Sequence, residues 1–188
     1  MSGMSDMSGM RYAAFFRNLN LGRPRCPDRA AFEAAFVAAG ALSAASFLTN
    51  GTMAFDAPSA RAAARVVAGA QKLLLQQVGL REPAFLREME WLADLVAAQP
   101  FDGVEQAGVY GCYVSFLHRD AVVPLDAVLR MARGEVEVVC MSGREVFSVA
   151  RQIGKSPGSP NAFLEKLLAL PATTRAWNTV VRLVEKHS

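Results

Sequence analysis

Histidine and cysteine are scarce in this chain of 188 residues, which has two histidines and three cysteines. The cysteines, Cys26, Cys112 and Cys140, lie far apart, and no CxxC, HxxxH or mixed Cys/His cluster occurs. Zinc sites need closely spaced ligands and most hydrolase triads need a histidine, so neither is expected. An odd number of cysteines without an export signal predicts reduced thiols in the cytoplasm. We therefore expect no metal and no cofactor.

Long apolar runs are also missing. No uninterrupted apolar stretch reaches the roughly 18 residues that a membrane-spanning helix needs, so we expect no membrane association. The first ten residues, MSGMSDMSGM, lack the cationic start and the apolar centre of a signal peptide. We interpret residues 1–10 as a disordered or tag-like lead-in, and we expect a cytoplasmic protein.

Charge of one sign is not in excess. The chain has 20 Lys and Arg against 17 Asp and Glu, a net charge of +3, which argues against a basic nucleic-acid-binding tail or an acidic arm. Hydrophobic residues make up 52% and charged residues 20%, so most of the chain is not disordered. Composition predicts a soluble globular protein of one compact domain or two small ones.

The first half of the chain predicts alternating strands and helices. Asp28 is expected to cap a helix that Gly40 ends. Asn50-Gly51 lies between two strand-like runs and favours a hairpin, because both residues tolerate a positive φ. The predicted elements are a strand over 11–20, a helix over 28–40, the hairpin around Asn50-Gly51, a helix over 59–78, an edge strand over 83–89 and a helix over 90–98.

The second half repeats this order. The predicted elements are a strand over 109–118, a helix over 125–133, two strands within 135–150 around Ser142-Gly143, a helix that starts at 159–161, and a final helix over 174–187. Strand, helix, hairpin and helix thus occur twice, in the βαββα order of a ferredoxin-like unit.

We predict an α+β fold of duplicated ferredoxin-like (βαββα) subdomains with antiparallel sheets and a C-terminal helix. The predicted boundaries are 11–89 for the first subdomain, 90–108 for a helical linker, and 109–188 for the second subdomain with the C-terminal helix.

Two apparent enzyme signatures lack their context. Residues 118–120 spell the HRD triplet of kinases, but no Gly-rich loop, strand lysine or DFG accompanies it. Residues 154–156 spell the GKS end of a phosphate loop, but Val149 stands where the first glycine is required. We interpret the first triplet as a strand end and the second as part of a connecting loop.

A basic loop leaves a nucleic-acid partner open. Its arginines are Arg17, Arg23, Arg25 and Arg29. Clusters of this kind neutralise backbone phosphates. The RNP1 pattern is absent from both hairpins, and the strand aromatics are interpreted as core rather than as base-stacking platforms.

The predicted C-terminal helix has two distinct faces. Its polar face is expected to carry Arg175, Thr179, Arg182 and Lys186. Trp177 begins the opposite, apolar face. The polar face either meets phosphate or is solvated. Thr173 or Thr174 is expected to cap the helix, and the helix start with Arg175 is a candidate anion site.

Segments near both ends resemble a known family. Residues 172–180 read ATTRAWNTV, which is similar to the signature ATTRNWNTV of the uncharacterised bacterial domain-of-unknown-function family numbered 1697. Residues 16–22 (FRNLNLG) are similar to its LRGINVG motif, and residues 47–52 (FLTNGT) occupy its YIQSGN position. The resemblance implies two ferredoxin-like α+β subdomains, and it implies no established activity, substrate or cofactor.

The chain departs from these motifs at three positions. Asn18 replaces a glycine of the family pattern, and Thr52 and Ala176 each replace an asparagine. If these positions form a ligand site in the family, the site is altered or lost in this divergent member.

Our leading hypothesis is a cytoplasmic protein that binds an anionic ligand or nucleic acid where the loop after the first strand meets the C-terminal motif. Arginine and asparagine together bind phosphates and base edges. The candidate ligand-binding residues are Arg17, Asn18, Asn20, Asn50, Gly51, Thr173, Thr174, Arg175 and Asn178.

Two alternatives of other classes stay open. One is an enzyme that acts on a phosphorylated or anionic small molecule, in which Arg, Asn and Thr side chains stabilise an oxyanion; no catalytic residue is nominated, since no acid–base pair is evident. The other is an assembly module that pairs through an exposed sheet edge without a small ligand. An oligomer is possible, but nothing in the sequence indicates one.

Arg175 distinguishes these hypotheses. It is a solvated surface residue, a ligand residue, or a buried structural residue linked to the strand end at residues 17–20. We favour the structural role over the ligand role, because Trp177 and the neighbouring caps already serve packing.

Overall fold

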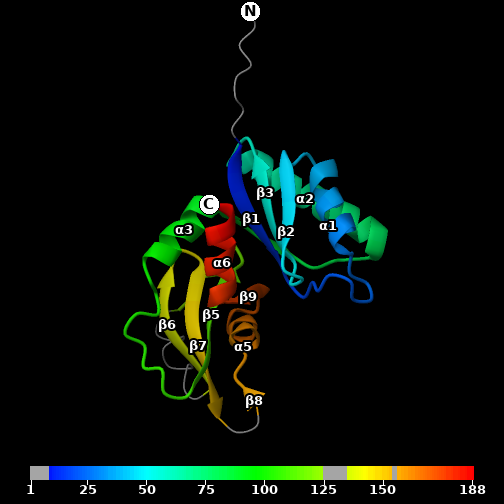
Figure 1. Ribbon diagram of the computed structural model, residues 1–188. Coiled ribbons are helices and arrows are strands. Elements are labelled where there is room, and N and C mark those ends of the chain that lie inside the picture. Colours follow the sequence, from blue (N-terminus) through cyan, green and yellow to red (C-terminus); the bar gives the residue numbers. More distant parts are fainter. Residues whose placement is uncertain (1–8, 125–134, 154–155) are drawn as a thin grey trace, which may run out of the picture. The chain divides into compact units, whose positions relative to one another are not determined.

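The computed structural model describes residues 9–124, 135–153 and 156–188. The chain divides into two compact units, one of Met1–Trp91 with His187–Ser188 and one of Leu92–Lys186. Each unit contains one antiparallel sheet with helices packed on it (Figure 1). The predicted α+β fold with a duplicated arrangement is therefore confirmed. In the described parts of the chain, no helix is long and apolar enough to cross a membrane.

The first unit is a four-stranded ferredoxin-like unit. Its elements are β1 (Met10–Phe16), α1 (Arg29–Ala38), β2 (Ser43–Phe47), β3 (Thr52–Ala57), α2 (Ala60–Val78) and β4 (Ala84–Glu88). The strand order is β2-β3-β1-β4, so the last strand of the unit returns to pair with the first.

Local sequence signals set the limits of the helices in this unit. The Asp28 side chain accepts a hydrogen bond of 2.8 Å from the Ala31 amide, as expected for the cap of α1. Ser59 caps α2 in the same way, and α2 ends at Gly79, whose φ of 73° lies in the left-handed region.

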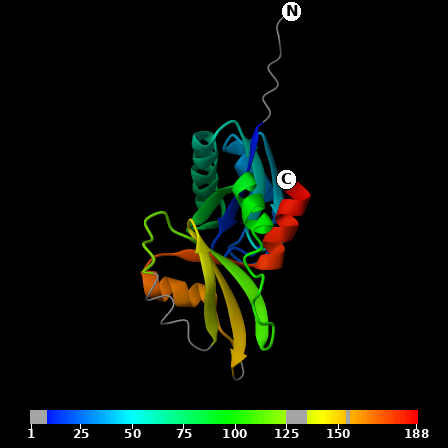
Figure 2. The ribbon, with the colours of Figure 1, turned by 90° about the vertical axis from the view of Figure 1, so that its left-hand side faces the viewer.

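One face of the first sheet packs on α1 and α2, as the two views in Figures 1 and 2 show. Phe16 of β1 meets Phe32 of α1 edge to face, with the ring centroids 5.3 Å apart. Phe36 of α1 packs on Phe55 of β3, with centroids 5.2 Å apart. These buried aromatic residues form the core of the unit, in agreement with the sequence-based interpretation.

Both predicted hairpins are present, but their turns differ from the expected ones. Phe47 pairs with Thr52, so four residues, 48–51, connect β2 and β3, and Leu48 and Gly51 have positive φ. In the second hairpin the pairing of Ser142 with Glu145 places the turn one residue later than expected. Strand register fixes the length of a turn, and a dipeptide signal alone does not.

The second unit repeats the strand order of the first. Its elements are α3 (Met89–Ala97, which begins in the first unit), β5 (Val109–Leu117), β6 (Val136–Ser142), β7 (Glu145–Ile153), β8 (Ser156–Pro157), α5 (Pro160–Leu168), β9 (Ala172–Ala176) and α6 (Trp177–His187). The order is β6-β7-β5-β9, with the short β8 beside β7. The predicted helix over 125–133, part of the GKS triplet and most of the predicted lead-in lie outside the described residues.

The start of the C-terminal helix corrects one prediction. The helix begins at Trp177, not at residue 174, and residues 172–176 form strand β9. In β9, Thr174 pairs with Ser115 of β5 and Arg175 pairs with Val114. The edge of β5 offers backbone partners to this segment, and its adjacent β-branched threonines favour extended backbone. Thr173 and Thr174 therefore do not cap the helix, and Arg175 does not belong to its polar face.

A cluster of three polar side chains connects β1, β2 and β3 at one end of the first sheet. Arg11 of β1 makes a bidentate ion pair with Asp56 of β3, with distances of 2.8 and 3.0 Å. Ser43 of β2 donates its hydroxyl to the same carboxylate. These interactions, the hydrogen bond from Arg11 foremost, hold the pKa of Asp56 below its ordinary value.

This lowered pKa predicts how stability depends on pH. A carboxylate whose pKa is depressed by folding stabilises the fold above its unfolded pKa, and this contribution is lost as the pH falls through the folded pKa. Asp56→Asn should therefore lower the free energy of unfolding by about 0.5–1 kcal/mol at pH 7, and the difference from wild type should shrink as the pH falls below about 4. Urea unfolding at several pH values measures this. Asp94→Asn, at an exposed position of α3, is the control, and a constant deficit for Asp56→Asn at all pH values would contradict the account.

Candidate functional site

The nine residues predicted to bind a ligand belong to both units of the chain. Five lie in the first unit: Arg17, Asn18, Asn20, Asn50 and Gly51. Four lie in the second unit: Thr173, Thr174, Arg175 and Asn178.

In the first unit, Glu82 binds two of the predicted residues. Arg17 Nη1 lies 2.9 Å from Glu82 Oε2, and Asn18 Nδ2 donates to Glu82 Oε1 over 3.4 Å. The Arg17 amide also donates to the Pro83 carbonyl. These bonds connect the end of β1 to the segment that leads into β4, so Arg17 and Asn18 have a structural role that sequence analysis did not identify.

The turn after β2 also serves the fold. Asn50 Oδ1 accepts a hydrogen bond of 2.8 Å from Thr52 Oγ1. The Gly51 carbonyl accepts a bond of 2.8 Å from the amide of Phe16, at the end of β1. Asn20 is exposed, and its carbonyl accepts from Arg23 within the following loop. The turn and the β1 end are therefore tied together by the backbone.

In the second unit, Arg175 is buried, with 7% of its surface exposed. Its Nη1 donates to Thr173 Oγ1 over 2.9 Å and to the Thr174 carbonyl over 3.0 Å. Burial lowers the pKa of Arg175 to about 10, so the side chain stays charged at neutral pH. The interpretation of Arg175 as a solvated surface residue is wrong. Asn178, by contrast, is exposed in the first turn of α6.

The first unit has an arginine at the equivalent position. Arg87 is the second-last residue of β4, as Arg175 is of β9, and it pairs with Ala13 of β1. Arg87 Nη1 donates to the carbonyl of the preceding residue, Leu86, over 2.7 Å. A side chain that makes the same bond in both repeats belongs to the fold of the unit. This repetition favours a structural role for Arg175.

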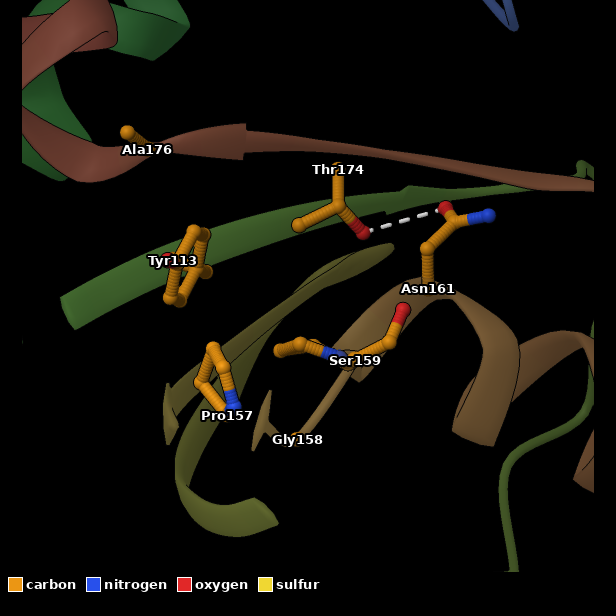
Figure 3. A pocket seen from close by; sticks show the side chains of 8 residues that line it. Tyr113, Pro157, Gly158, Ser159, Asn161, Thr174 and Ala176 are labelled. Carbon is orange, nitrogen blue, oxygen red and sulfur yellow. Dashed lines mark hydrogen bonds between the residues drawn. The ribbon is translucent and has the colours of Figure 1, made fainter. Parts of the chain in front are cut away.

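A pocket of about 370 Å³ lies in the second unit, at the N-terminus of α5 (Figure 3). Its lining comes from β5, β9 and the segment that leads into α5. The lining residues are Tyr113, Pro157, Gly158, Ser159, Pro160, Asn161, Thr174 and Ala176. Thr174 is the one residue of the nine candidates among them.

A chain of hydrogen bonds connects the sheet to this pocket. Thr174 Oγ1 donates to Asn161 Oδ1 over 3.1 Å, the bond drawn in Figure 3. Thr174 Oγ1 also lies 2.7 Å from the hydroxyl of Ser115, which is fully buried. Because the single Thr174 proton goes to Asn161, Ser115 donates to Thr174. The Asn161 amide is thus held in a fixed orientation by residues of β5 and β9.

Two glycines give the pocket its shape. A Cβ at Gly158 would collide with the carbonyl group of Glu135, so this segment can approach residue 135 closely only with glycine. A Cβ at Gly111 would lie 2.8 Å from Tyr113 Oη, so Gly111 leaves room for the tyrosine ring that forms one wall. Burial raises the pKa of Tyr113 above its ordinary value, which keeps its hydroxyl protonated.

The hydroxyl of Ser148 lies on the same side of the second sheet as Tyr113. Ser148 of β7 is directly opposite Tyr113, and side chains of directly paired residues share a face. It is fully buried, and its Oγ makes no hydrogen bond to the described parts of the chain. This face of the sheet thus carries two fully buried hydroxyl groups, those of Ser115 and Ser148.

Sequence analysis did not select most of the pocket residues. Ser159, Pro160 and Asn161 were recognised only as the start of a helix, and Ser159 does cap α5 through the Ala162 amide. Tyr113 was interpreted as an ordinary strand residue. The helix start at residues 159–161 was the one signal in the sequence that pointed to this pocket. Its proximity to Thr174 depends on the pairing of β5 with β9, whose partners are about 60 positions apart.

Together, the fold and the pocket define a protein class: a duplicated ferredoxin-like α+β protein with a small pocket in its second unit. The chain belongs to the family described as "Protein of unknown function (DUF1697)", whose model matches residues 10–147. The match confirms the resemblance noted in the sequence. It includes the FRNLNLG and FLTNGT segments and ends before the C-terminal motif.

A solved structure has a similar fold. It is described as that of the conserved bacterial protein SP0830 from Streptococcus pneumoniae, with a TM-score of 0.66 over 96% of this chain and 100% of that one. The two sequences are 13% identical, so this likeness concerns the fold alone. No curated protein matches the chain.

Arg175 can be tested directly by truncation. Arg175→Ala leaves the Thr173 hydroxyl and the Thr174 carbonyl without this buried donor, so the free energy of unfolding should fall by roughly 1–3 kcal/mol. Arg182→Ala, an exposed position on α6, should change it by less than about 0.5 kcal/mol. Urea unfolding measures both. Equal, small effects of the two substitutions would refute a structural role for Arg175.

Gly51 gives a second test of structural against ligand-binding roles. Its φ of 70° suits glycine, and a Cβ there would lie 2.8 Å from Leu19 Cβ. Gly51→Ala should therefore destabilise the protein by about 1–3 kcal/mol. Gly103 also has a positive φ but has open space around it, so Gly103→Ala should cost only about 1 kcal/mol. Thermal unfolding that shows no larger loss for Gly51→Ala would contradict the steric argument.

Proposed function

We propose that this protein binds a small anionic ligand, specifically a carboxylate, in the pocket at the N-terminus of α5. The observation that carries the proposal is that the N-terminus of α5, with an Asn161 side chain held by Thr174, lies at a pocket that Tyr113 also lines. The volume of about 370 Å³ lies in the range of pockets that hold small molecules.

The first turn of α5 supplies a donor for such a ligand. The amides of Ala162 and Phe163 are bonded to the side chain and the carbonyl of Ser159, and Pro160 has no N–H. Among the described contacts, the backbone N–H of Asn161 is therefore the group of the first turn that can donate to an external acceptor. The helix dipole favours negative charge at this end.

The charge of the lining selects the kind of anion. None of the lining residues is a lysine or an arginine, so the pocket has a few neutral donors and no full positive charge. Such a site suits a singly charged group better than a polyphosphate, which normally binds several cations. The opposite wall, formed by Tyr113, Pro157 and Ala176, offers apolar contacts to the rest of a small molecule.

The geometry favours this function over the two other hypotheses about ligands. Two of the four loop arginines already have partners: Arg17 binds Glu82, and Arg29 binds the carbonyls of Ser46 and Leu48. This weakens the case for a nucleic-acid surface. The lining of the pocket contains hydroxyl and amide groups but no acid–base pair, so the pocket favours binding over proton-transfer catalysis.

Asn161→Asp tests the proposal without removing the internal hydrogen bond. Thr174 can donate to the new carboxylate as it does to the amide, and an aspartate in a first helical turn is compatible with the helix dipole. The added negative charge should repel a carboxylate ligand, and affinity should fall at least about tenfold. Isothermal titration calorimetry with acetate and benzoate measures this.

The matched control is Asn178→Asp, at an exposed position outside the pocket that belongs to the nine candidate residues. It should leave the affinity unchanged. Absence of wild-type binding to either carboxylate at millimolar concentration would contradict the proposal. A loss caused by Asn178→Asp, and not by Asn161→Asp, would move the site to the C-terminal motif.

A further inference from the structure

The outer strand β2 differs from the other outer strands of the two sheets. The described sheets end in β2 and β4, and in β6 and β9. β4, β6 and β9 each contain at least one charged residue, whereas β2 has the sequence SAASF, without charge or proline. Charges and prolines on an outer strand discourage pairing with another chain. β2 contains no such residue of its own.

Helix α1 supplies what β2 lacks. α1 lies beside β2 in the first unit (Figure 1). Glu33 Oε1 accepts a hydrogen bond of 2.9 Å from the Ser46 amide and one of 2.8 Å from its hydroxyl. Arg29 Nη1 donates to the Ser46 carbonyl over 3.2 Å, and Nη2 donates to the Leu48 carbonyl over 3.4 Å.

These bonds occupy the outer side of the strand. Backbone groups of successive strand residues point alternately to the two sides of the strand. Since the Ser46 amide and carbonyl meet α1 side chains, Ser46 and Ala44 face outward, and their neighbours pair with β3. Of these two outward residues, Ser46 is fully engaged by α1.

We propose that Arg29 and Glu33 form an edge latch that prevents β2 from pairing with the β2 strand of a second copy of this chain. Without the latch, two β2 strands can pair antiparallel about a two-fold axis, because each offers the same uncharged edge to the other. A second copy fits better than a charged peptide, since the strand has no charged side chain to select one. The latch does not depend on the proposed ligand pocket, which lies in the other unit.

The double variant Arg29→Ala/Glu33→Ala tests the latch by removing both side chains. Its weight-average mass in light scattering should rise with concentration toward twice the 20.2 kDa of the chain. Wild type should show no such rise. The matched control Arg65→Ala/Glu90→Ala removes the same charges from exposed helical positions, and it should behave as wild type.

A second measurement uses the unaltered protein and does not depend on how the variant folds. The Ser46 amide should exchange its hydrogen at least about tenfold more slowly than the Ala44 amide of the same edge, because only Ser46 donates to a carboxylate. Glu33→Gln retains an acceptor oxygen and should preserve much of this protection, whereas Glu33→Ala should remove it. Amide exchange followed by NMR resolves the individual sites.

Two results would overturn the latch. One is a folded double variant that associates no more than wild type and the charge-matched control. The other is a Ser46 amide that exchanges as fast as the Ala44 amide in wild type, because the contact between α1 and β2 would then not protect the edge.

Discussion

Pairing between β5 and β9 determines the architecture of the second unit. The backbone of residues 172–176 extends along the free side of β5, and this places Arg175 in a buried position and Thr174 on the face that meets α5. Alternation along a strand explains why these neighbours have opposite environments. The same pairing brings the Thr174 hydroxyl to Ser115 and Asn161, which belong to two other elements. The pocket therefore exists only when the sheet is complete.

The first unit shows the same design with different chemistry. β4 closes the first sheet against β1, and its Arg87 repeats the bond that Arg175 makes to the preceding carbonyl. At the position equivalent to Thr174, however, β4 has Leu86. The first unit thus has an apolar side chain where the second unit has the Thr174 hydroxyl, which is hydrogen-bonded to Ser115 and Asn161. The repeat explains the fold, and the difference between the repeats agrees with the proposal that the ligand site lies in the second unit.

Local signals in the sequence were sufficient for most of the fold. Asp28 and Ser59 each cap the helix that their position predicts, and apolar periodicity identified the helix over 59–78. Strand β9 was missed because its threonines directly precede a helical pattern, and its partner β5 is about 60 residues away. A strand that depends on such a distant partner has a weak local signal.

The candidate site was harder to predict than the fold for a related reason. Arg17 and Asn18 are polar residues of the kind that bind ligands, but Glu82 engages them through the pairing of β1 with β4. Residue type indicated hydrogen-bonding capacity correctly and did not indicate the partner. The sequence pattern at residues 159–161 predicts a helix start, and a helix start accounts for an asparagine without a ligand. The connection of Asn161 to Thr174 emerges only from the register of β5 and β9.

The proposed ligand site lies at the N-terminus of α5, and not at the motif residues near the chain ends. Amide chemical-shift mapping by NMR during a titration with benzoate tests this most directly. The account predicts that the largest saturable changes occur at Asn161, Ala162 and Thr174, with little change at Asn20 and Asn178. Changes concentrated at residues 17–20 and at Asn178, with the α5 amides unaffected, would contradict it.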